Sequence, residues 1–369
     1  MGTVVGYGVD RGKYIVPDPE SYTSKMRDLP NLDFVRSVAV ISVVVEHTLL
    51  ALRVDQIGPF PVQYFGVLGV LVFFVLTALV LMWSLERKPH TLDFYIRRWF
   101  RIYPLAILSI VAALIFHAPT SGTITNYFQY QHPHLRDVVV QMALVQDLIF
   151  VNRPTIGVLW TLPYEVQMYL LLPVLFFFVQ KNFSTKPLLV LWIFLLLLVR
   201  HVPADGHNFG VAMGYFLPGV MAYIGFGRWK PNLPAWLLPV FLLVLWLMFL
   251  PRFDFHKGWG FCLIFALGLP FFKQIKSEIV LAPSRQIAKY SYGIYLMHSF
   301  AIVIGMYLFR GHSLAVRLAA ELVPLVVLPI LAYHLVEHPM IRLGARLAAR
   351  AEKKYEQREL KYFRKLPAA

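Results

Sequence analysis

Arg36 and His47 lie eleven residues apart in the apolar stretch FVRSVAVISVVVEHTLLAL. Eleven helical residues turn through about 1100°, close to three full turns, so the two side chains share one face of a helix. They are separated along the axis by roughly 16 Å, about half the hydrocarbon core of a bilayer. Ionisable side chains in a membrane segment are costly to bury and usually mark a site. The pair therefore predicts a passage with a cation near one end and an imidazole deep inside it.

A carboxylate that orients an imidazole is the usual arrangement for a general base acting on a hydroxyl. Glu165, in LWTLPYEVQMYLLLP, is predicted at a depth similar to that of His47. We interpret His47 and Glu165 as the catalytic pair, with a structural hydrogen bond between two helices as the alternative. Glu46 points about 100° away from His47 on the same helix, so we expect it not to share that face; pairing elsewhere in the bundle and a catalytic role both stay open.

A second group of basic residues occurs in FYIRRWFRIYP, which we place in an inner loop. Its arginines are Arg97, Arg98 and Arg101. Guanidinium groups interleaved with aromatic rings suit the binding of phosphates and the stacking of a purine. Arg36 is close enough to the same inner surface to join them. The alternative is that these arginines only set the orientation of the chain in the membrane.

The remaining polar residues give weaker signals. His298, near the middle of the apolar segment that contains SYGIYLMHSF, is either a core histidine or a substrate contact. His132 and His134 flank a proline without a third ligand at metal spacing, so we expect no metal site. Cys262 is the single cysteine and lies in an apolar run. With no plausible nucleophile, direct transfer assisted by a general base is the simpler mechanism.

The composition places all of these residues in a membrane protein. Of the 369 residues 58% are hydrophobic and 15% are charged, whereas a soluble domain carries about 25% charged residues. We predict an all-α polytopic transmembrane bundle of about ten spans. The predicted spans are roughly 34–53, 62–84, 102–117, 158–180, 187–201, 211–227, 235–251, 258–273, 287–309 and 314–336.

The charge distribution predicts the topology. With both termini in the cytoplasm, most of the 35 lysines and arginines fall on the inner side, which explains the net charge of +15 without nucleic acid. Residues 1–30 are predicted to form a cytoplasmic tail without a signal peptide, and 341–369 a basic cytoplasmic tail on the anionic leaflet. LRDVVVQMALVQDLIF, in the long outer connection, is expected to be an interfacial helix or a partly buried re-entrant segment.

Taken in order, these segments resemble acyltransferase family 3, integral membrane O-acyltransferases that move acyl groups, often from acyl-coenzyme A, to sugars and other hydroxylated acceptors. Arg36 and His47 fit the family's Arg-x10-His signature, and Asp33 precedes them as is common there. RRWFRIYP resembles its inner arginine loop and LWTLPYEVQMYLLLP its Trp-x-Leu-x-x-Glu segment, while SYGIYLMH and EHP resemble its last two helices. Ser37, Thr77-Ala78 and Thr161 depart from residues frequent in the family, which leaves the identity of the substrate open.

The resemblance covers residues 31–340 and implies that they form a membrane acyltransferase domain. It implies acyl transfer, with acetyl as the expected group, from acyl-coenzyme A as co-substrate to a hydroxyl of a sugar, glycan or glycolipid. Together with the motifs above, we predict His47 and Glu165 as catalytic residues, Arg36, Arg97, Arg98 and Arg101 as donor-binding residues, and Asp33, Trp160, Tyr164 and His298 as substrate-binding residues. No permanent cofactor, metal or nucleic acid is expected, and the expected location is a bacterial plasma membrane.

Two alternatives stay open. A protein of the same fold could acylate a cytosolic small molecule such as a macrolide sugar. A proton-coupled transporter or flippase would instead use the buried His and Glu as a proton relay. The chain shows no internal repeat, which disfavours the transporter.

Overall fold

The computed structural model describes residues 29–120, 130–149, 151, 153–199 and 209–363. In these residues the protein is a bundle of helices with one short hairpin, in which Gln56 pairs with Pro61 and Ile57 with Phe60. The elements are α2 (Pro30–Ala51), β1 (Gln56–Ile57), β2 (Phe60–Pro61), α3 (Gln63–Arg87), α4 (Thr91–Ile115), α5 (Leu135–Met142), α6 (Leu162–Asn182), α7 (Thr185–Val199), α8 (Phe209–Arg228), α9 (Leu237–Phe249), α10 (Phe255–Gly268), α11 (Glu278–Ile302), α12 (Leu314–Ala332) and α13 (His338–Phe363).

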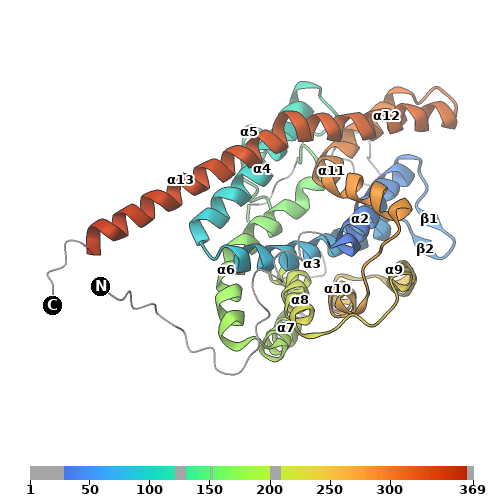
Figure 1. Ribbon diagram of the computed structural model, residues 1–369. Coiled ribbons are helices and arrows are strands. Elements are labelled where there is room, and N and C mark those ends of the chain that lie inside the picture. Colours follow the sequence, from blue (N-terminus) through green and yellow to red (C-terminus); the bar gives the residue numbers. More distant parts are fainter. Residues whose placement is uncertain (1–28, 121–129, 150, 152, 200–208, 364–369) are drawn as a thin grey trace.

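Helices α2 and α3 form the centre of the bundle. α2 packs between α3 and α11, and α3 also packs on α6, α8 and α10. The approach of α2 to α3 is close at Gly69, where an added Cβ would lie 2.5 Å from the carbonyl oxygen of Ala39. Helix α2, which carries both residues of the predicted passage, is therefore held closely against the backbone of α3 (Figure 1).

Seven helical segments in the described residues are long and apolar enough to cross a membrane. They are Pro30–Ala51, Gln63–Arg87, Thr91–Ile115, Gly157–Lys181, Gly210–Arg228, Glu278–Leu308 and Leu314–Lys353. The other three predicted spans are helical but short, because α7, α9 and α10 have 15, 13 and 14 residues, against about 20 for a bilayer. The helical membrane class is supported, whereas the count of ten spans is not confirmed and the orientation of the termini stays a prediction.

Helix α4 corrects the predicted inner loop. It begins at Thr91, eleven residues before the predicted start of the third span, so the arginines stand on a helix rather than in a loop. His90 caps the helix, its Nδ1 accepting a hydrogen bond from the backbone N–H of Asp93 at 3.3 Å. Asp93 in the first turn interacts favourably with the helix dipole, and it pairs with Arg97 one turn later. Pro104 lies inside α4 without ending it.

The C-terminal part forms one long rod (Figure 1). α12 continues through a π-helical turn, Tyr333–Glu337, into α13 without a break, so the boundary predicted at residue 340 falls within this helix. α13 packs along α4 through small residues: Ala348 is fully buried, and a Cβ on Gly344 would lie 2.6 Å from the Cβ of Phe100. Placement of the tail on the anionic leaflet stays a prediction.

Two further predictions concern the N-terminal tail and the interfacial segment. The predicted N-terminal tail, residues 1–30, lies almost entirely outside the described residues. In the predicted interfacial segment, α5 is helical over eight residues and packs on α4, with Asp137 and Gln141 buried.

Candidate active site

Arg36 and His47 lie on the unbroken helix α2, as predicted, and each belongs to a different polar group. Arg36 belongs to what we call the arginine cluster, defined as Arg36, Arg98, Arg101, Glu165 and Glu337. His47 belongs to what we call the histidine pair, formed with His298.

The arginine cluster brings together α2, α4, α6 and the π-helical turn after α12. Arg101 forms an ion pair with Glu337, whose carboxylate is fully buried. Glu165, in the first turn of α6, accepts a hydrogen bond from the hydroxyl of Tyr169 at 2.5 Å. Glu165 also interacts electrostatically with Arg98, Arg101 and Arg36.

Arg98 is the member of this cluster with an unsatisfied donor. Its Nε is buried and has no hydrogen-bond partner among the described residues. A buried guanidinium donor is costly to leave unpaired. The arrangement can therefore offer this donor to an anion.

Helix α11 connects the two groups through three residues spaced three apart. The hydroxyl of Tyr292 donates to the carbonyl of Ile102 at 2.6 Å, and the guanidinium of Arg101 lies 5.9 Å from the centre of its ring. The hydroxyl of Tyr295 donates to the carbonyl of Val158 at 2.8 Å, and its ring lies 6.1 Å from that of His298. A line of polar side chains thus runs along α11 from the arginine cluster to the histidine pair.

The histidine pair has a defined tautomer. The Nδ1 of His47 lies 2.9 Å from the carbonyl oxygen of Val43, and the Nδ1 of His298 lies 3.1 Å from that of Ile294. A carbonyl oxygen only accepts, so each neutral ring carries its proton on Nδ1 and its basic lone pair on Nε2. The two ring centres are 5.0 Å apart, at an angle of 73°.

The two imidazoles differ in exposure. His298 is fully buried, and its Nε2 has no hydrogen-bond partner within the described part of the chain. His47 keeps 25% of its side chain exposed. Of the two, His47 is therefore placed to meet a reacting hydroxyl.

The carboxylate that lies beside His47 is Glu46, which corrects the expectation that Glu46 does not share the face of His47. Its Oε2 is 3.4 Å from the Nδ1 of His47. The two Cβ atoms do leave the helix about 100° apart, but the three bonds of a glutamate side chain are long enough to fold back along α2. On α3, Gly66 faces this carboxylate.

His47 and Glu165 are not brought together as the sequence suggested. The described contacts of Glu165 are with Tyr169 and the arginine cluster, whereas those of His47 include Glu46, Val43 and His298. The prediction inferred proximity from depth alone. The predicted depth does not fix the direction in which the Glu165 side chain leaves α6, and the guanidinium groups of α4 attract its carboxylate.

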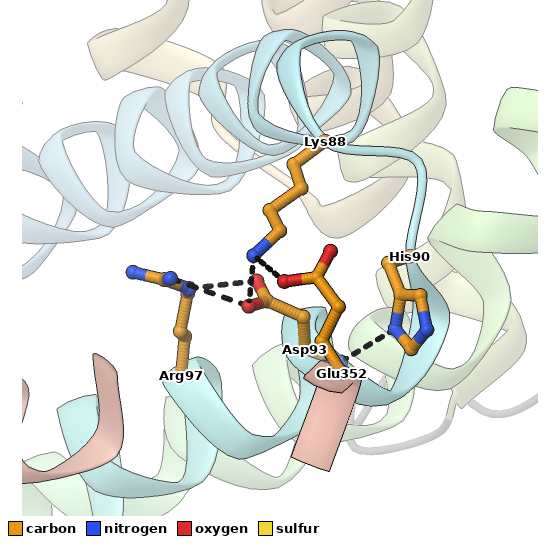
Figure 2. Close-up of polar contacts among 5 residues, drawn as sticks. All are labelled: Lys88, His90, Asp93, Arg97 and Glu352. Atoms are coloured by element: carbon orange, nitrogen blue, oxygen red, sulfur yellow. Dashed lines mark hydrogen bonds and ion pairs between the residues drawn. The ribbon is translucent and has the colours of Figure 1, made fainter. Parts of the chain in front are cut away.

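Arg97 is separated from the other predicted donor-binding arginines. Its Nε and Nη2 donate to the two carboxylate oxygens of Asp93 at 2.7 and 3.2 Å (Figure 2). Lys88 bonds the same carboxylate at 2.7 Å and that of Glu352 on α13 at 2.6 Å. These hydrogen bonds, first to Asp93 and then to Glu352, raise the pKa of Lys88. Arg97 thus belongs to a network that joins the α3–α4 turn to α13.

The predicted substrate-binding residues lie in varied surroundings. Asp33 interacts electrostatically with Arg36. Tyr164 is buried at 2% exposure, and its ring centre lies 6.4 Å from that of the partly buried Trp160. Contact of any of these residues with a substrate stays a prediction.

Sequence reasoning missed Glu321 on α12. It is 4% exposed, and its Oε1 accepts a hydrogen bond at 2.5 Å from Thr48, the residue after His47. A lone carboxylate in the apolar run AELVPLVVLPILA was the available signal. In the described residues, no group of three His, Cys, Asp or Glu side chains is arranged to hold a metal ion.

The fold defines a polytopic helical membrane protein with two buried polar groups in its core. The family model described as "acyltransferase domain" matches residues 29–334, so the chain belongs to acyltransferase family 3, as the sequence motifs indicated. It is similar to acyltransferase MdmB of Streptomyces mycarofaciens, with 33% identity over 125 residues. That alignment covers 31% of this chain and 30% of the length of the relative. No solved structure matches the chain significantly.

Proposed function

We propose that the protein transfers an acyl group from acyl-coenzyme A to a hydroxyl of a sugar, glycan or glycolipid, with His47 as the general base. The observation that carries this proposal is the position of His47. Its Nδ1 is fixed by the carbonyl of Val43, its side chain is 25% exposed, and its helix leads to the arginine cluster. A base with its lone pair on Nε2 and an anion site on the same helix suit a phosphorylated donor and a hydroxyl acceptor.

The donor end of the proposal rests on Arg36, Arg98 and Arg101. Coenzyme A carries phosphates at one end and its thioester at the other, joined by the extended pantetheine arm. The unsatisfied Nε of Arg98 supports phosphate binding, and Arg97 lies apart because Asp93 holds it. Trp99, the residue after Arg98 on α4, is 54% exposed and stacks on Tyr103 with ring centres 3.8 Å apart, which suits stacking of a purine.

The chemistry at His47 balances without a further reactant. Nε2 takes the proton of the acceptor hydroxyl while the oxygen attacks the thioester carbonyl. The tetrahedral intermediate expels the thiolate of coenzyme A, which takes the proton from His47. The products are the ester and free coenzyme A, and His47 is neutral again. Alignment of both substrates in one desolvated passage supplies a further part of the rate.

Two finer expectations belong to the same proposal. An acetyl group is the expected cargo, and a bacterial plasma membrane the expected location, supported by the inner excess of lysine and arginine. The macrolide-sugar alternative uses the same residues and differs in the acceptor and in the side from which it enters.

Purified protein in nanodiscs tests the proposal. Binding of acetyl-coenzyme A and of longer acyl donors is measured by calorimetry, and transfer by the release of thiol in the presence of a panel of methyl glycosides. We expect micromolar binding and acceptor-dependent release of thiol. Absence of binding by every donor would reject acyl-coenzyme A as the co-substrate and would favour the transporter.

A further inference from the structure

We infer that Glu46 is the carboxylate that positions His47 for proton transfer, and that Gly66 provides the space in which this carboxylate sits. The inference rests on the proposed function, because it assigns a role to Glu46 through His47. It replaces Glu165 as the supporting carboxylate of the base.

The contact between the two side chains is direct. Oε2 of Glu46 lies 3.4 Å from the Nδ1 of His47, and the same nitrogen lies 2.9 Å from the carbonyl oxygen of Val43. The Nδ1 proton thus points to the carbonyl oxygen of Val43, and the Glu46 carboxylate lies beside the same nitrogen. Contacts of this kind are often long in an enzyme without substrate and shorten in the reacting complex.

Burial makes the position of Glu46 informative. The residue is 8% exposed, in the last third of the candidate membrane span Pro30–Ala51. A carboxylate placed there without a function lowers stability, and one that served only to tie two helices would bond a side chain of the other helix. The residue of α3 that faces Glu46 is instead a glycine.

Gly66 leaves room that any other residue would fill. A Cβ at this position would lie 1.7 Å from Oε2 and 2.8 Å from the Cδ of Glu46, and 3.2 Å from the Cα of Val43. The severe overlaps are with the far end of one flexible side chain, not with the backbone of α2. An alanine at residue 66 would therefore move the carboxylate and leave the helices largely in place.

The role in the reaction follows from charge. When Nε2 takes the hydroxyl proton, the ring becomes an imidazolium inside a region of low dielectric. A carboxylate at 3.4 Å stabilises that positive charge and keeps the ring in the orientation that Val43 defines. Glu165 does not provide this interaction, since it is engaged by Tyr169 and the arginine cluster.

A double-mutant cycle tests the inference in nanodiscs, with acetyl-coenzyme A as donor and thiol release as the assay. The variants are Glu46→Gln, Glu46→Ala, Gly66→Ala and the double variant Glu46→Ala with Gly66→Ala. We expect Glu46→Ala and Gly66→Ala each to lower kcat about 100-fold, the lower end of the range for general-base catalysis. KM and the calorimetric affinity for acetyl-coenzyme A should stay within about twofold of wild type, because the arginine cluster is untouched.

Non-additivity identifies the mechanism. If Gly66→Ala acts by moving the carboxylate, it has no further effect once Glu46 is alanine, so the double variant should match Glu46→Ala. Gly69→Ala is the matched control, because it disturbs the same α2–α3 contact at the backbone of Ala39 without reaching Glu46. We expect it to reduce thermal stability and to retain the kcat of wild type per folded molecule.

The outcomes separate the inference from the proposed function. A wild-type kcat in Glu46→Gln, or additive losses in the double variant, would overturn the positioning role while leaving acyl transfer intact. A loss in Gly69→Ala equal to that in Gly66→Ala would also overturn it, since packing alone would then explain the result. A wild-type protein that uses no acyl donor would reject the proposed function, and the inference would fall with it.

Discussion

The imidazole rings of His47 and His298 lie edge to face, with their centres 5.0 Å apart and each Nδ1 held by a carbonyl of its own helix. The two rings therefore present the same tautomer, with basic lone pairs on both Nε2 atoms. One ring is partly exposed and the other fully buried, which suggests a division of labour. His47 would take the proton of the reacting hydroxyl, and His298 would accept a hydrogen bond from a second hydroxyl of the acceptor.

Replacement of His298 tests this division. His298→Phe keeps a flat ring but removes the acceptor, and we expect kcat/KM for a glycoside acceptor to fall about tenfold, the worth of one hydrogen bond. The loss should appear mainly in KM for the acceptor. His298→Gln, which restores an acceptor oxygen, should recover part of it. Steady-state kinetics with acetyl-coenzyme A held at saturation measure both values, and a fall in kcat alone would instead assign His298 to the chemical step.

Replacement of His47 tests the base itself. His47→Ala removes the only group to which we assign the hydroxyl proton, and we expect transfer to fall by at least about 100-fold. The affinity for acetyl-coenzyme A should persist, because the donor phosphates are assigned to the arginine cluster. Calorimetry and thiol release on the same sample report the two properties. Wild-type transfer by this variant would remove His47 from the mechanism.

The Arg36–His47 relationship was predictable, because two residues on one helix are fixed by sequence spacing alone. Contacts between helices were not. Glu165 and His47 were assigned to each other by depth, and the structure places Glu165 with the arginines on α4. Glu46 was set aside because its Cβ points away, although its long side chain reaches Nδ1. Sequence periodicity gives the direction in which the Cα–Cβ bond leaves the helix, but it does not give the position of the far end of a flexible side chain.

Arg98 provides the test of the donor site. Its unsatisfied Nε lies in the arginine cluster, so we expect Arg98→Ala to weaken the binding of coenzyme A about tenfold or more, since charge-assisted hydrogen bonds are strong. Arg97→Ala is the matched control, one residue earlier on α4, because Asp93 already accepts hydrogen bonds from its Nε and Nη2. Calorimetric titration with coenzyme A measures both. Equal losses would mean that the phosphates also reach Arg97.

The start of α4 shows a second limit of sequence reasoning. Hydropathy placed the third span after Arg101 because four charged residues between Asp93 and Arg101 depress the apolar signal. In the structure Arg101 pairs with Glu337, which is distant in sequence, Asp93 pairs with Lys88 and Arg97, and the helix extends eleven residues further back. A pattern that reads only local hydropathy cannot include those partners.

The last prediction concerns the network of Lys88, Asp93, Arg97 and Glu352, which ties α13 to the α3–α4 turn (Figure 2). Glu352→Gln removes the one carboxylate that α13 contributes, and we expect faster hydrogen exchange of the amides of residues 345–363. The effect should be small, about 0.2–1 kcal/mol of local opening free energy, because Lys88 and Glu352 are 35% and 28% exposed. Asp93→Asn should have a larger effect, since Asp93 is 4% exposed and neutralises both Lys88 and Arg97. Because its hydrogen bonds raise the pKa of Lys88, the contribution of Lys88 to stability is complete at neutral pH and is lost as the pH rises through that raised pKa.

Arg285→Gln, which breaks the exposed pair with Glu278 on α11, is the control and should leave exchange in α13 unchanged. Equal exchange of α13 in Glu352→Gln and wild type would show that Gly344 and Ala348 hold the helix on α4 without the ion pair.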